Sequence, residues 1–248
     1  MKRLLRIFLP ALAFVAGTGI AAAQWVQRTY SLQPGWNAVF LDVLPEPAEC
    51  DLLFAGLPVE SVWDFNPSVD SPQFVQDPST LIPGAPGWLT WFPPASPSAG
   101  VGNLFILRDA RPYLIKLAEG AAPVNWTVTG RPSLRKLTWR PGGVNFVGFR
   151  AGDTGPTFQS LFAGEAGLVG QPVYTLTAGG AWQQLANLAT ARPESGRAYW
   201  VRCASPAQRT ATFEVDAGSR AGLEFSGPTS ELTLRLRNTS TGARSLSL

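Results

Sequence analysis

An internal repeat constrains the fold of this chain more than any other feature, because similar stretches must fold into similar units. "RTYSLQPGWNAVFLDV" at residues 28–43 resembles "RKLTWRPGGVNFVGFR" at residues 135–150. Gly35-Trp36-Asn37 then aligns with Gly143-Val144-Asn145 at an offset of 108 residues, and the same offset aligns two copies of "LFAG". Further along, "RPYLIKLA" matches "RAYWVRCA" at an offset of 86 residues.

The repeat predicts two tandem modules, module one at residues 26–132 and module two at residues 134–220. Three inserted residues in module two raise the offset to 111 where Val62-Trp63 aligns with Val173-Tyr174, and the offset then falls to 86, so module one carries about 25 extra residues. These residues lie in an aromatic and proline-rich insertion at about 66–103.

Short strands are the expected building blocks of both modules. The chain holds 25 glycines and 22 prolines, and 45% of its residues are hydrophobic, which is typical of many short strands joined by turns. Short helical turns are expected near "AECDLLFAG" and "TFQSLFAG". The predicted fold is all-β, with two tandem antiparallel β-sandwich or barrel-like modules. In module one the expected strands are residues 29–32, 36–43, 59–65, 103–108 and 112–118.

The C-terminal strands, residues 221–248, differ from both modules. "ELTLRLRN" alternates between apolar and polar residues and is followed by the turn cluster "NTSTG" and by "ARSLSL". Two interpretations stay open. The segment is either a hairpin that docks on module two or the start of an immunoglobulin-like third module in a longer protein.

The N-terminus has the three parts of a secretory signal peptide at residues 1–23. A basic start precedes an apolar run and Ala21-Ala22-Ala23, so we expect cleavage after Ala23. A retained membrane anchor is the alternative. No later stretch is apolar for the roughly 18 residues that a membrane span needs. The expected location is secreted, extracellular or at the cell surface, with the periplasm as a further option.

Removal of the signal changes the charge balance. The chain has 20 Lys and Arg against 17 Asp and Glu, and the signal takes away three bases, so no nucleic-acid footprint remains. Residues 24–107 hold one base and eight acids, whereas residues 108–248 hold 16 bases and nine acids. These opposite charges predict either two solvated surfaces, which is the favoured interpretation, or an attraction between the halves or between chains associated head to tail.

"LQPGWNAVFLDVLP" followed by "SGRAYWVRC" resembles the "GWNLISLP…GKGYWV" β-modules of secreted, multi-domain bacterial proteins. Module two departs from this pattern with Val144 in place of the tryptophan. The resemblance implies a β-rich extracellular module that lies beside other β domains. It implies partners among the other domains of the same protein or among cell-surface components, and it carries no catalytic residues.

The absence of histidine excludes the most common general base and the Ser-His-Asp triad. No phosphate-binding or nucleophile motif is present, and we predict no metal and no cofactor. A pair of carboxylates acting on a polysaccharide remains as one enzymatic alternative, and calcium binding is a second use of clustered acids. The candidate acids are Asp42, Glu60, Asp64, Asp70 and Asp77.

Cys50 and Cys203 raise the question of a disulfide in an exported protein. Cys203 aligns with Leu117, a position expected in the core, so a small buried thiol is the favoured interpretation. A disulfide between the two modules is the alternative.

Trp88, Trp91 and Phe92, in "GWLTWFPP", are the predicted ligand-binding residues. On a proline-stiffened loop they would stack on sugar rings. The competing interpretation is a lid on the core, and it is favoured by Trp182, which falls near the equivalent place in module two.

Gly35, Asn37, Gly143 and Asn145 are predicted to form a turn and the start of a strand in each module. Trp36 would then be the first inward position of its strand. The leading functional prediction is an exported, non-catalytic, structural or adhesive pair of β-modules in a larger bacterial protein. A carbohydrate-binding accessory module is the first alternative, and a carboxylate-dependent enzyme is the second.

Overall fold

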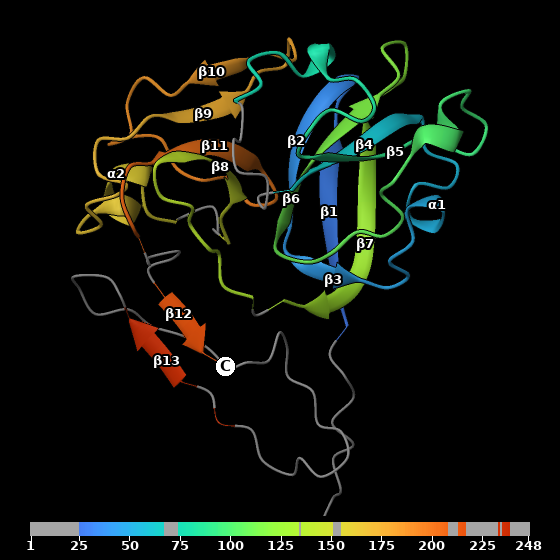
Figure 1. The fold of residues 1–248 in the computed structure, drawn as a ribbon. Coiled ribbons are helices and arrows are strands. Elements are labelled where there is room, and N and C mark those ends of the chain that lie inside the picture. Colours follow the sequence, from blue (N-terminus) through green and yellow to red (C-terminus); the bar gives the residue numbers. More distant parts are fainter. Residues whose placement is uncertain are drawn as a thin grey trace, which may run out of the picture.

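A computed structural model describes residues 25–66, 74–133, 135–150, 155–207, 213–216, 233 and 235–238. The predicted all-β class is confirmed, since several antiparallel sheets account for nearly all the regular structure (Figure 1). The predicted signal peptide and Asp70 lie outside the described residues.

Module one is a sandwich of two sheets that enclose a hydrophobic core. The outer sheet has the order β1-β7-β3, with β1 at Val26–Leu32, β7 at Val124–Pro132 and β3 at Val43–Pro45. The second sheet has the order β2-β6-β4-β5, with β2 at Gly35–Leu41, β6 at Arg111–Leu117, β4 at Val59–Phe65 and β5 at Trp88–Trp91. The short helix α1, Cys50–Leu53, contributes Cys50 to the core between them.

Module two contains one four-stranded sheet in the order β10-β9-β11-β8. Its strands are β8 at Gly143–Gly148, β9 at Val173–Leu176, β10 at Trp182–Gln184 and β11 at Ala198–Cys203. Helix α2, Phe158–Phe162, and the loops around it pack on one face of this sheet and form a second core. Both helices lie where the sequence predicts helical turns.

The two four-stranded sheets have the same strand order and register. Asn37 pairs with Ile115 across β2 and β6, and Asn145 pairs with Val201 across β8 and β11. These pairs are related by the offsets of 108 and 86 residues found in the sequence. The register also places Trp88, opposite Phe65, in the same position as Trp182, opposite Leu176.

A third hydrophobic cluster, here called the junction cluster, joins the two sheets. Its buried members from module one are Phe40, Trp63, Phe65, Trp88 and Leu114, and those from module two are Phe146, Leu176, Trp182, Ala198 and Trp200. The β2-β6-β4-β5 sheet is therefore buried on both faces, which explains why its strands read as nearly continuous apolar runs.

Backbone contacts also connect the modules at two sheet edges. At the edge of β2, the Phe40 N–H donates to the Gly196 carbonyl at 2.8 Å. At the edge of β10, Gln76 in the insertion of module one donates through Nε2 to the Trp182 carbonyl at 2.8 Å. The Trp182 N–H donates back to the Gln76 carbonyl at 3.3 Å.

Two predicted segments of module one differ from the expectation. "GWLTWF" was expected as a loop, but Trp88–Trp91 forms strand β5, because its alternate side chains pack into two different clusters. Residues 103–108 were expected as a strand but form only one isolated bridge, between Ile106 and Glu49. Leu104 and Leu107 are buried and anchor this segment, while Phe105 is 71% exposed.

The C-terminal strands form a separate ribbon. Strand β13, Arg235–Asn238, pairs with β12, Phe213–Asp216, so a strand from the end of module two, residues 134–220, pairs with the C-terminal segment. All four residues of β13 are exposed. The predicted second strand, "ARSLSL", lies outside the described residues, as does the rest of the expected third module.

Candidate functional site

The repeated turn before β2 and β8 is built by an asparagine in each module. Asn37 accepts from the Gln33 N–H at 2.8 Å and donates to the Gln33 carbonyl at 2.8 Å. Asn145 likewise accepts from the Arg140 N–H at 2.8 Å and donates to its carbonyl at 3.1 Å. The side-chain amides thus hold both turns closed.

The left-handed glycine of this turn differs between the modules. It is Gly35, with φ of 80°, in module one and Gly142, with φ of 78°, in module two. The sequence alignment matches Gly35 with Gly143. The turn "RPGG" of module two is one residue longer than "QPG" of module one, so its left-handed glycine is Gly142, one residue before the strand begins.

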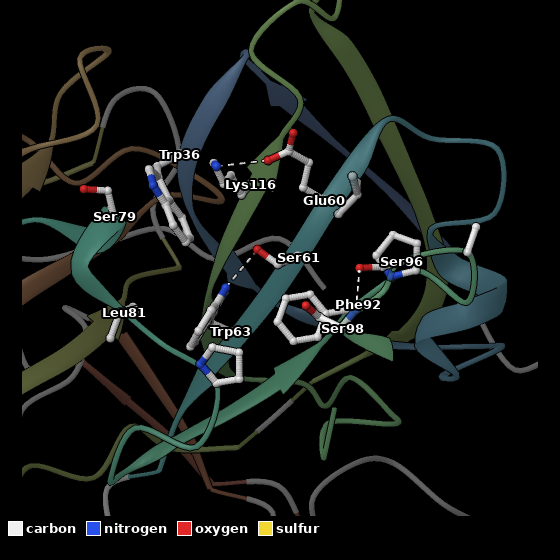
Figure 2. Close-up of a pocket in the computed structure, with 14 residues that line it drawn as sticks. Trp36, Glu60, Ser61, Trp63, Ser79, Leu81, Phe92, Ser96, Ser98 and Lys116 are labelled. Atoms are coloured by element: carbon white, nitrogen blue, oxygen red, sulfur yellow. Dashed lines mark hydrogen bonds and ion pairs between the residues drawn. The ribbon is translucent and has the colours of Figure 1, made fainter. Parts of the chain in front are cut away.

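The strongest candidate site lies beside this turn. A pocket of about 630 Å³, here called the Trp36 groove, opens on the β2-β6-β4-β5 sheet next to the part that module two covers (Figure 2). Its volume is in the range of small-ligand sites. Trp36 and Phe92 are partly exposed along it, whereas Trp63 is only 3% exposed.

Three aromatic rings shape the Trp36 groove. The Trp63 ring lies 6.3 Å from the Trp36 ring and 6.3 Å from the Phe92 ring, measured between centroids. Trp63 Nε1 donates to the Ser61 hydroxyl at 2.9 Å, which fixes the indole that both outer rings contact. Partly exposed rings around a fixed ring form an apolar surface on which a flat ligand can stack.

Polar groups accompany the rings. Lys116 Nζ contacts the Glu60 carboxylate at 3.0 Å and lies 5.9 Å from the centroid of the Trp36 ring. Figure 2 shows this ion pair above the rings, and Ser79, Ser96 and Ser98 also line the pocket. The groove thus combines apolar faces with hydrogen-bonding groups, as small-molecule sites do.

The predicted ligand-binding residues are divided by the fold. Trp88 is 5% exposed and belongs to the junction cluster, and Trp91 is 6% exposed in the core of module one. Their ring faces are therefore not presented to a ligand. Phe92 alone of the three lines the Trp36 groove.

The candidate acids that the structure describes have separate partners. Asp42 accepts from the Tyr30 hydroxyl at 2.9 Å, and Asp64 contacts Arg111 at 2.7 Å. Glu60 pairs with Lys116, and Asp77 accepts from the Ser79 N–H at 2.8 Å. Burial raises the pKa of Asp64 to about 6, although the Arg111 guanidinium opposes this shift.

The two cysteines are free and lie in different cores. Cys50 is in the core of module one and Cys203 in that of module two, and both are fully buried. Burial raises the pKa of the Cys50 thiol to about 12. Within the described part of the chain, no group of three or more Cys, Asp or Glu residues could hold a metal ion. No helix among those residues has the length and apolar character needed to cross a membrane.

The sequence interpretation missed most of the Trp36 groove. It assigned Trp36 to the first inward position of its strand, it named Glu60 only as a candidate acid, and it did not single out Trp63 or Lys116 as site residues. The missing signal is the pairing of β2, β4 and β6, which brings these distant positions together.

Comparisons with known proteins return no relative. No family model matches the chain, and neither a curated protein nor a solved structure is similar enough to be reported.

Proposed function

We propose that this chain is an exported, non-catalytic pair of β-modules that serves as a structural or adhesive part of a larger bacterial surface or secreted protein. The observation that carries the proposal is the junction cluster, which fuses two sheets of the same strand order through buried aromatic side chains. An aromatic side chain buries about 150–250 Å². A junction of this kind makes the pair one stiff unit.

Matching internal contacts support an origin of the pair by duplication. The Tyr113 hydroxyl accepts from the Arg108 N–H at 2.7 Å, and the Tyr199 hydroxyl accepts from the Glu194 N–H at 2.9 Å. Both contacts join a residue to the fifth residue before it, and they are related by the sequence offset of 86 residues. The tandem arrangement would give the larger protein a rigid spacer.

Export is tested by producing the full chain in a Gram-negative host and sequencing the N-terminus of the protein outside the cytoplasm. The expected mature chain begins at Gln24. A variant with Lys2→Glu and Arg3→Glu should be processed poorly, because the basic start of the signal is lost. A cytoplasmic protein that still begins at Met1 would contradict export.

A second candidate function, carbohydrate binding, is favoured by the Trp36 groove. Its partly exposed rings can contact the C–H face of a sugar, and its lysine, glutamate and serines can bind hydroxyl groups. This proposal keeps the expected class of ligand and moves the site from Trp88 and Trp91 to Trp36, with Phe92 retained.

Pull-down on insoluble polysaccharides and a glycan array tests this second function. Trp36→Ala should weaken binding by about tenfold or more, as tryptophans central to a binding site do. Trp25→Ala is the matched control, since Trp25 is 48% exposed and does not line the groove. Equal loss with both variants, or no binding to any glycan, would reject this function. Release of reducing ends from a bound polysaccharide would favour the enzymatic alternative.

A further inference from the structure

A second pocket, of about 260 Å³, lies where the two modules meet, away from the residues of the Trp36 groove. Residues 108–112 at the start of β6 form its module-one side, and residues 135–147 before and within β8 form its module-two side. We call it the junction pocket. Neither the repeat nor the proposed functions assign a role to it.

Positive charge dominates the lining of the junction pocket. Its single lining carboxylate belongs to Asp109. Five lining side chains are cationic, namely Arg108, Arg111, Arg135, Lys136 and Arg140. All five belong to the first seven bases of the basic half of the chain, residues 108–248, so this pocket gathers part of the positive charge that the sequence concentrates there.

Buried acids hold two of these cations in place. Arg111 donates to Asp64 through Nε at 3.0 Å and through Nη2 at 2.7 Å, and Nη2 also donates to the Phe65 carbonyl at 2.9 Å. Arg135 Nε contacts Asp109 at 3.0 Å, and Asp109 is only 3% exposed. Because these two arginine side chains are already ordered, a ligand that binds them loses less free energy to the ordering of side chains.

Apolar side chains form most of the remaining pocket wall, together with Thr138 and Asn145. Phe65, Pro112, Val144 and Phe146 line it, and Phe65 and Phe146 are buried in the junction cluster. A cleft with apolar walls and charge of one sign focuses the electric field and attracts counter-ions. The volume is slightly below the usual range for drug-sized ligands, so the pocket fits a small unit rather than a polymer segment.

We propose that the junction pocket binds an acidic monosaccharide unit that carries a carboxylate or sulfate group. The oxyanion lies among the guanidinium groups, whose planar donors match such groups in a bidentate way. The body of the sugar lies against the apolar wall. Arg108 is the cation to test, because its side chain is exposed and its backbone, not its side chain, makes the contact with Tyr113.

Isothermal titration calorimetry of the full chain with three sugars tests the proposal. Galacturonate and galactose 6-sulfate carry the two candidate oxyanions, and galactose is the neutral control. We expect one or both acidic sugars to bind and galactose not to bind. Affinity should fall with added NaCl, since the screening length falls from about 10 Å at 0.1 M to about 3 Å at 1 M.

Two variants locate the site. Arg108→Gln should weaken binding of the acidic sugar by about tenfold, the effect of losing one charge-assisted contact. Arg237→Gln removes an equal charge from the exposed strand β13, outside the pocket, and should leave the affinity unchanged. Lys136→Gln provides a second pocket variant if Arg108→Gln does not fold.

Three outcomes would overturn the proposal: no binding of either acidic sugar, equal binding of galactose, or unchanged affinity in both pocket variants. Trp36→Ala separates this site from the Trp36 groove. It should weaken polysaccharide binding at the groove by about tenfold or more without changing the titration of the acidic sugar, so the two proposals can be refuted independently.

Discussion

The contact between Phe40 and Gly148 gives a sharp test of how the two sheets pack. These residues occupy equivalent positions in β2 and β8, at the offset of 108 residues, and they face each other in the junction. A Cβ added to Gly148 would lie 2.0 Å from Cγ of Phe40 and 2.2 Å from its Cβ. The normal separation of carbon atoms in contact is about 3.5–4.0 Å.

Gly148→Ala should therefore destabilise the chain. In a strand interior, replacing glycine by alanine normally stabilises by about 0.5–1 kcal/mol. Here Phe40 is 4% exposed and cannot move aside, so overpacking should reverse the sign and cost about 1–3 kcal/mol. Phe40→Gly alone should cost at least about 3–5 kcal/mol, because it removes the whole buried side chain and leaves a cavity.

The double variant decides between this contact and a general effect of substitution. With Phe40→Gly in place, Gly148→Ala should cost less than about 0.5 kcal/mol, because Cγ and Cβ of Phe40 are both gone and the added methyl enters the vacated space. Urea unfolding followed by tryptophan fluorescence measures each free energy of unfolding, and the m-values should agree across the set. Gly120→Ala is the control, since a Cβ there has no atom within 4 Å. Additive costs for Phe40→Gly and Gly148→Ala would refute the packing argument.

Three further predictions concern the turn, a buried acid and the thiols. Asn37→Leu should lower the free energy of unfolding by about 1–3 kcal/mol, because the backbone N–H and carbonyl of Gln33 lose their hydrogen-bond partner. Trp36→Val should lower it by less. The reverse order in urea unfolding would contradict the role of Asn37 in the turn. Since burial raises the pKa of Asp64 from 3.8 to about 6, the folded chain binds an extra proton between these values. The free energy of unfolding of the parent chain, minus that of Asp64→Asn, should therefore fall by about 2–3 kcal/mol from pH 4 to 7. A difference between the two chains that stays constant over this pH range would argue against the raised pKa. Cys50 and Cys203 should react with a thiol reagent slowly in the folded chain and rapidly in urea, and fast labelling of the folded chain would show that the cores open.

Much of the fold can be predicted from the repeat. In each module a "PG" turn precedes an asparagine, which lies two residues after Gly35 or Gly143, and its side-chain amide holds the turn. The equivalence of Trp88 and Trp182 indicates a packing position. Strand β5 was missed because glycine and proline flank it closely, and those residues usually mark loops.

The candidate sites were harder to predict, for a physical reason. In a sheet buried on both faces, apolar residues point to either side, so the sequence does not distinguish a buried tryptophan such as Trp88 from a partly exposed one such as Trp36. The junction pocket depends on how two modules meet, and no pattern within one module encodes that contact.

The edge contacts between the modules bear on aggregation. An unpaired strand edge offers N–H and C=O groups to any other chain, and proteins usually protect such edges. Here Gly196 of module two contacts the edge of β2, and Gln76 of module one contacts the edge of β10. A cut between the modules would open both edges at once and expose the aromatic face of each sheet. Neither half is therefore expected to stay monomeric when it is produced alone, and the two modules protect each other from edge-to-edge association.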